Sequence, residues 1–278
     1  MKYAGWLQPL RLIGAAAAVC LLIAGVGDAR VPGEPNVLRA TLSNGLRVII
    51  IRNTLAPVAA TAVNYLVGGD ETPKGFPGTA HALEHMMFRG SPGLSADQLA
   101  NIGSVMGGSF NANTREAVTQ YLYTVPSEDL DVALHIEALR MHSVDSTQAD
   151  WDKERGAIEQ EVAADVSNPS YLLYQKLRAV LFAGTPYEHA ALGTRESFDV
   201  TPASQLKAFH DTWYAPNNAI LVIAGDVGLK ETLARVKALF GAIKPKKLPA
   251  RPKMAFAPPK ASSLCLHGDR TYNPLRSV

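Results

Sequence analysis

The segment His81-Ala-Leu-Glu84-His85 constrains its own local structure more than any other part of the chain. Positions i, i+3 and i+4 lie on one face of an α-helix, so a helix brings these three polar side chains together. Two neutral imidazoles are good zinc ligands, and a carboxylate beside them can accept a proton from water. The order H-x-x-E-H is the inverted form of the zinc-peptidase motif. The alternative interpretation is a helix with two hydrogen-bonded structural histidines and a solvated glutamate.

The segments around this motif resemble the pitrilysin-type zinc peptidases, a family that includes insulin-degrading enzyme and the mitochondrial processing peptidase. The motif and its flanks, Gly78 to Ser91, are similar to the zinc-binding helix of that family. Further segments extend the resemblance over about residues 36–250: Gly108–Thr114, Thr119–Tyr121, Glu154–Pro169, Pro186-Tyr187, Leu192-Gly193 and Trp213–Val227. The resemblance implies an α+β fold, with a mixed, largely antiparallel sheet packed with helices, that is one half-unit of the pitrilysin-type metallohydrolase fold.

Local patterns predict the same class, because strands are grouped before and after runs of helices. Strands are expected at 37–42, 46–51, 58–67, 110–114, 118–125 and 219–224, and helices at 79–88, 95–106, from 127, 148–167, 171–182, 202–212 and 229–240. Asn44-Gly45 predicts a two-residue hairpin turn. Ser95 with Gln98 predicts a capping box, and Ser127 a helix N-cap. The sequence contains no G-x-x-x-x-G-K loop for a nucleotide.

A catalytic zinc has three protein ligands and one open position. The resemblance implies one zinc per chain, bound by His81, His85 and Glu161, with Glu84 as the catalytic base. Glu161 follows His85 after 75 intervening residues. Glu154 lies seven residues before it, on the same side of the predicted helix, and is implied as a supporting carboxylate of the catalytic site. The alternative is that these helix glutamates form a solvated face.

Phe110, Asn111 and Ala112 are the expected substrate-binding residues. Peptidases that cut extended chains often bind them as an added strand at a sheet edge. In the resembled family the matching segment does this, and its asparagine helps to fix the scissile amide. The alternative is an ordinary turn, because glycine, serine and asparagine favour turns. The implied function is zinc-dependent cleavage of peptides or unfolded protein segments.

Three regions are expected along the chain. Residues 1–29 have the layout of a signal peptide, with Lys2 and Arg11 before an apolar run and small residues near Ala29. This predicts a periplasmic protein, with a retained N-terminal membrane anchor as the alternative. Residues 30–250 form the zinc-peptidase domain. Residues 251–278 are expected to be a linker and the truncated start of a second half-unit.

Partners follow from the same resemblance, because family members contain two half-units. We therefore expect a homodimer, or a heterodimer with a second half-unit, for full activity. The net charge of +2 predicts no nucleic-acid partner. One alternative function is a non-catalytic subunit that docks on a partner, which the complete set of His81, Glu84, His85 and Glu161 disfavours. Another is a ribosylhomocysteine-type lyase, which needs a cysteine ligand that only Cys265 offers after residue 29.

Overall fold

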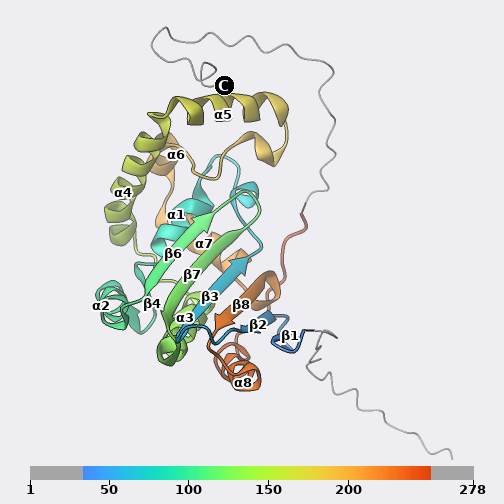
Figure 1. Ribbon diagram of the computed structural model, residues 1–278. Helices are drawn as coiled ribbons and strands as arrows, with labels where there is room; N and C mark the ends of the chain where they lie inside the picture. Colours follow the sequence, from blue (N-terminus) through green and yellow to red (C-terminus); the bar gives the residue numbers. More distant parts are fainter. Residues whose placement is uncertain (1–33, 252–278) are drawn as a thin grey trace, which may run out of the picture.

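The computed structural model describes residues 34–251, so the expected signal peptide and nearly all of the expected linker lie outside the described range. Its centre is a six-stranded sheet with the strand order β1-β2-β8-β3-β7-β6 (Figure 1). All neighbouring strands are antiparallel except β2 and β8, which are parallel. The strands are β1 (Val37–Thr41), β2 (Arg47–Arg52), β3 (Val58–Tyr65), β6 (Ser109–Thr114), β7 (Thr119–Pro126) and β8 (Ala219–Gly225), with the small pair β4 (Gly90–Ser91) and β5 (Leu94–Ser95) apart from them.

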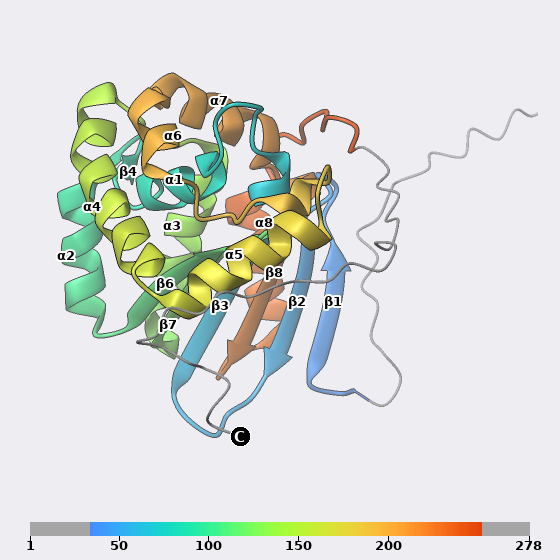
Figure 2. The ribbon, with the colours of Figure 1, turned by 90° about the horizontal axis from the view of Figure 1, so that it is seen from above.

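Helices cover one face of this sheet (Figure 2). They are α1 (Thr79–Met86), α2 (Ala96–Met106), α3 (Leu130–His142), α4 (Gln148–Val166), α5 (Pro169–Leu181), α6 (Arg195–Val200), α7 (Ala203–Trp213) and α8 (Leu229–Phe240). Short 3₁₀ turns occupy Gly69–Glu71, Ser127–Asp129, Pro186–Glu188 and Pro216–Asn218. A mixed sheet packed with helices confirms the predicted fold class. Within residues 34–251, none of the helices is both long and apolar enough to span a membrane.

The alternation of side chains along the central strands produces this one-sided packing. On β3, Ala59, Thr61, Val63 and Tyr65 are buried, while the residues between them are partly exposed. Successive side chains of a strand point to opposite faces, so the buried set marks the face beneath the helices. The largest fully buried side chain is Trp151 of α4, which belongs to one continuous core of aromatic and aliphatic residues. Burial of this apolar face is the main stabilising contribution to the fold.

Two local predictions were wrong. The hairpin between β1 and β2 has a three-residue loop, Ser43 to Gly45, because Leu42 pairs with Leu46 across it. Gly45 takes a φ of +89°, which favours glycine, and the buried Asn44 amide donates to the carbonyls of Phe240 and Ile243. These long-range bonds favour the longer loop.

Ser127 does not cap a helix, because it begins a 3₁₀ turn that precedes α3. The predicted capping box at α2 is confirmed, since Ser95 and Gln98 exchange both hydrogen bonds. The short helix α6 lies in a stretch for which the sequence predicted no helix. Its N-terminus is closed by a reciprocal pair of bonds between Thr194 and Ser197.

Candidate metal centre and active site

Helix α1 carries the H-x-x-E-H residues through the middle of the molecule. It begins after Gly78, whose φ of +85° allows the chain to turn sharply into the helix. A Cβ atom at Gly78 would lie only 2.6 Å from the Cα of Gly193, so two glycines permit a close approach of two backbone segments. This approach brings the residue before Gly193 next to the motif. The Leu192 carbonyl accepts a hydrogen bond from His81 Nδ1 at 3.0 Å.

Helix α4 supplies the two glutamates that face α1. Its N-terminus is capped by Thr147, whose hydroxyl accepts from the Asp150 amide. Trp151 is fully buried and its indole N–H donates to the Thr201 carbonyl at 2.6 Å, which fixes the rotation of the helix. Glu154 and Glu161, two turns apart, then lie on the side toward α1. Both contact His85, whereas their seven-residue spacing had predicted only a shared side of the helix.

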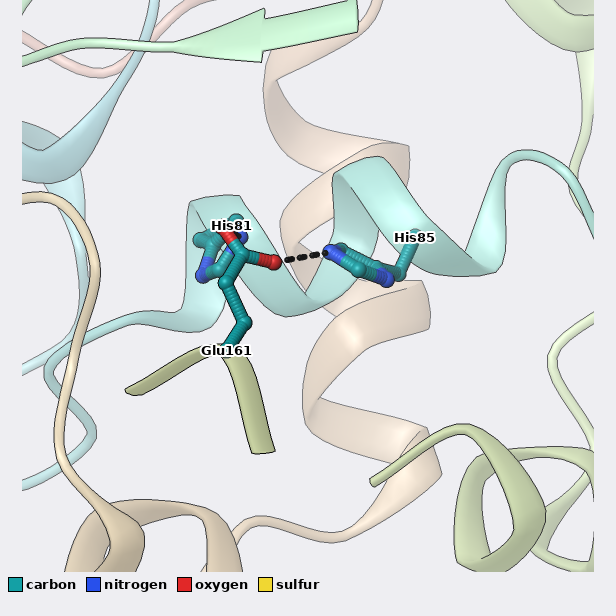
Figure 3. A group of neighbouring side chains, drawn as sticks. All are labelled: His81, His85 and Glu161. Carbon is teal, nitrogen blue, oxygen red and sulfur yellow. Dashed lines mark ion pairs between the residues drawn. The ribbon is translucent and has the colours of Figure 1, made fainter. Parts of the chain in front are cut away.

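His81, His85 and Glu161 form the one group within residues 34–251 whose donor atoms are arranged for a metal ion. One donor atom from each residue lies within 4.8 Å of the others (Figure 3). Glu161 Oε1 is 3.5 Å from His81 Nε2, and Oε2 is 3.3 Å from His85 Nε2. Two imidazole nitrogens and one carboxylate oxygen are a donor set that zinc favours. The residues therefore fit the expected ion.

The remaining ring nitrogens of the two histidines have acceptors of their own. His81 Nδ1 donates to the Leu192 carbonyl, which has no proton to give. His85 Nδ1 is 2.9 Å from Glu154 Oε1. These partners orient both rings and leave the Nε2 atoms free to bind a cation on the side of Glu161. Metal-binding histidines usually have such a carbonyl or carboxylate behind them.

Electrostatics also favour a cation at this position. Burial lowers the pKa of His85, but the hydrogen bonds with Glu154 and Glu161 outweigh burial and raise it to about 9. Hydrogen bonds from His81 and His85 hold the pKa of Glu161 well below its usual range. Carboxylates that stabilise a proton on His85 also stabilise a metal ion there, and the metal must displace that proton to bind.

Glu84 lies beside this group, on the same helix face as predicted. Its side chain is mostly buried, and this burial raises the pKa of its carboxyl group above the ordinary value. The Thr114 hydroxyl donates to Glu84 Oε2 and opposes that shift. A buried carboxylate with one fixed donor and a raised pKa is suited to accept and return a proton near neutral pH.

An open cleft of about 320 Å³ connects these groups to the edge of the sheet. Strand β6 forms this edge, since among the described strands it pairs only with β7. Phe110 and Asn111 of β6 are exposed and Ala112 is partly exposed, and all three line the cleft with the motif residues. Phe110 stacks on Phe88, with ring centroids 5.6 Å apart. The predicted substrate segment is thus a free strand edge next to the metal-binding group.

The structure adds three groups that the sequence analysis did not assign to the site: Thr114 on Glu84, the Leu192 carbonyl on His81, and Arg89 on Glu154. Thr114 and Leu192 lay in segments with family resemblance, but no pattern in either segment indicated these contacts. Arg89 lies four residues beyond His85, and no local signal links it to α4.

Another glutamate of α4 and three further histidines lie outside the group that could hold a metal ion. Glu159 of α4 pairs with Arg155 and Arg195. His135 and His142 of α3 are exposed. His210 is buried and its Nε2 donates to the Arg140 carbonyl, which is a structural role.

Comparison with known proteins relates this geometry to a family of enzymes. The family model described as Insulinase (Peptidase family M16) matches residues 47–195. A second model, described as the Peptidase M16 inactive domain, matches residues 202–273. The first match alone spans more than half of the chain and contains every residue of the candidate site.

Curated relatives include an uncharacterized zinc protease of Mycobacterium leprae, 29% identical over 78% of this chain and 49% of its own length. The zinc protease PqqE of Helicobacter pylori is 28% identical over 84% of this chain and 53% of its own length. The chain therefore spans about half the length of the curated relatives that it matches.

Solved structures give the same picture. A protease from Helicobacter pylori superposes with a TM-score of 0.73 at 28% identity, covering 80% of this chain and 54% of that one. The first half of the periplasmic protease PqqL from Escherichia coli has a TM-score of 0.75 at 24% identity, covering 82% and 51%. The latter likeness concerns the fold alone.

Proposed function

The chain belongs to peptidase family M16, and on this premise we propose that it is a zinc-dependent metalloendopeptidase that cleaves peptides or unfolded protein segments. The observation that carries the proposal is the convergence of His81, His85 and Glu161 within 4.8 Å, with Glu84 beside them at a cleft. In this proposal the first three residues hold one zinc ion. Glu84 is the general base, and Glu154 supports His85.

When bound, zinc would polarise the substrate carbonyl and make water a better nucleophile. Glu84 accepts a proton from the attacking water at its carboxylate and then returns it to the leaving amine. Thr114 keeps that carboxylate oriented through its hydroxyl group. The free edge of β6 binds the substrate backbone as an added strand, and Asn111 and Ala112 place the scissile bond near the base.

The test is a pair of measurements on the purified chain, its zinc content and its cleavage of an unstructured peptide. Replacing Glu84 with glutamine should leave the zinc content unchanged, because Glu84 is not a ligand in this proposal. Cleavage should fall by about 10²–10⁴-fold, the usual cost of losing a general base. Cleavage by Glu84→Gln at the wild-type rate would rule out this role, and loss of zinc would place Glu84 among the ligands.

We also propose that full activity needs a second half-unit, supplied by a second copy of the chain or by a partner protein. The support is the length relation, because the chain spans 49% and 53% of two curated relatives. The complete set of metal and base residues disfavours the alternative of a non-catalytic docking subunit. The lyase alternative would need Cys265, which lies outside the described residues.

Peptide cleavage by the chain alone, and after addition of a candidate second half-unit, tests this requirement. Addition should raise turnover by at least 10²-fold, the usual cost of one missing oxyanion donor. Full turnover by the isolated monomer, unchanged by the added protein, would show that no second half is needed. The proposed location is the periplasm, which the candidate signal peptide at residues 1–29 supports; those residues lie outside the described range.

A further inference from the structure

Arg89 follows α1 directly and reaches back to α4. Its backbone N–H donates to the Met86 carbonyl, 2.9 Å away, in the turn that closes the helix. Its side chain then extends to Glu154, where Nε donates to Oε2 and a terminal guanidinium nitrogen forms an ion pair with the same carboxylate. Two guanidinium nitrogens thus contact the same oxygen, Oε2, which lysine with its single nitrogen cannot reproduce.

The two oxygens of Glu154 have separate partners. Oε1 accepts from His85 Nδ1, and Oε2 accepts from Arg89. The Glu154 side chain is 9% exposed, so little solvent is available to satisfy it in another orientation. Without Arg89 the second oxygen would lose its fixed donor, and the carboxylate could rotate about its last bond. The orientation of the His85 ring would then be less well defined.

Charge supports the same assignment. Glu154 is a buried anion close to a second anion, Glu161, which also contacts His85. A buried carboxylate is costly unless it is paired and hydrogen-bonded. Arg89, whose side chain is 38% exposed, supplies a permanent positive charge from the solvent side. Arg89 thereby offsets part of the cost of burying the Glu154 carboxylate group beside His85.

We propose that Arg89 is a positioning residue for the metal centre: it holds Glu154, which in turn holds His85 with Nε2 directed toward Glu161. Among the hydrogen bonds and ion pairs of the described residues, the Arg89 side chain contacts Glu154 and none of His81, His85 and Glu161, so its influence on the metal passes through Glu154. This inference rests on the proposed zinc site. It assigns a task to a residue that the motif alone does not identify.

A matched control lies on α4. Arg155 pairs with Glu159 at 3.7 Å, and its side chain is 31% exposed. Removing its charge changes the net charge of the chain by the same amount as removing that of Arg89. It leaves Glu154 and His85 untouched.

The experiment measures zinc affinity of the full chain by competition with a chromogenic chelator, with no need for peptidase activity. Arg89→Met should weaken zinc binding by about 10-fold, at the lower end of the 10–100-fold range for partners of metal ligands. Arg89→Lys keeps the positive charge but not the paired N–H donors, so its zinc affinity should lie between those of Arg89→Met and the wild type. Arg155→Met should bind zinc as the wild type does.

The decisive comparison uses Glu154→Ala. If Arg89 acts through Glu154, adding Arg89→Met to Glu154→Ala should cause no further loss of zinc affinity, so the two effects are non-additive. Thermal unfolding of each variant checks that it is folded. Equal zinc affinity in Arg89→Met and Arg155→Met would overturn the inference. The inference would also be overturned if Arg89→Met lowered the zinc affinity of Glu154→Ala as much as it lowers that of the wild type. A wild-type chain that binds no zinc would overturn the proposed function and this inference with it.

Discussion

Replacing Glu161 with glutamine should weaken zinc binding strongly while leaving the fold intact. The substitution keeps the size of the side chain and removes the anionic member of the His81, His85 and Glu161 group. Structural zinc sites with four ligands bind with roughly 10–16 kcal/mol, so one ligand accounts for roughly 2.5–4 kcal/mol. Each tenfold change in the dissociation constant corresponds to about 1.4 kcal/mol, so zinc affinity should fall by about 10²–10³-fold.

Because Glu161 is partly exposed, the loss in zinc affinity should lie near the lower end of this range. Its side chain is 47% exposed, and solvent screens a charge that is only half buried. The loss should persist above pH 9, where the proton no longer competes with the metal for His85, because the pKa of His85 is raised to about 9. A loss confined to low pH would point to an indirect effect through His85.

The assay is zinc titration against a competing chelator at fixed ionic strength. Glu159→Gln is the matched control, because Glu159 is on the same helix and pairs with Arg155 and Arg195 instead. It should retain wild-type affinity. Unchanged affinity in Glu161→Gln, with a cooperative unfolding transition like that of the wild type, would refute the assignment of Glu161 as a ligand.

Three further predictions concern the base and the stability of the fold. Thr114→Val should keep its zinc but lose about 10-fold in peptide cleavage at neutral pH, because Glu84 loses a hydrogen-bond donor worth about 1.5–3 kcal/mol. The acid limb of the pH–rate profile should move up by about one pH unit. Thr114→Ser should restore both the rate and the pH profile. Burial lowers the pKa of His210 to about 4, so the unfolded chain takes up this proton first as the pH falls. The free energy of unfolding should therefore drop by about 3 kcal/mol between pH 7 and 4, a drop that denaturant titration should not find in His210→Gln. Burial, with Glu71 and Glu116 nearby, raises the pKa of Asp70 to about 6. Ionisation of Asp70 thus destabilises the fold progressively from about pH 4 to pH 6. Asp70→Asn should be more stable at pH 7 by up to about 1 kcal/mol, with the difference vanishing near pH 4.

The parts of the site that depend on spacing within one helix were predictable from the sequence. Residues with the spacing of His81, Glu84 and His85 share one face of a helix in any fold, and so do residues with the spacing of Glu154 and Glu161. That the two helices meet was implied by family resemblance rather than by the residues themselves. The strands were largely predictable too, because apolar runs and alternation determine them locally.

The contacts that depend on distant segments were not predictable. Thr114 meets Glu84 across 30 positions, and Arg89 meets Glu154 across 65. The loop at Ser43 to Gly45 differs from a two-residue turn because Asn44 bonds to the end of α8. In each case several local conformations have similar free energies, and contacts with distant segments decide which of them the chain adopts.

The central position of β8 has a consequence for biosynthesis. β8 lies between β2 and β3, yet about 150 residues separate the end of β3 from its start. At roughly 5–20 residues per second, a ribosome needs about 8–30 s to cover that distance. During this interval β2 and β3 each have an unpaired edge that can pair with another chain. Both metal-binding helices, α1 and α4, have been synthesised before β8 can join β2 to β3. A nascent chain that stops before Ala219 therefore has two sheet fragments in place of a smaller domain.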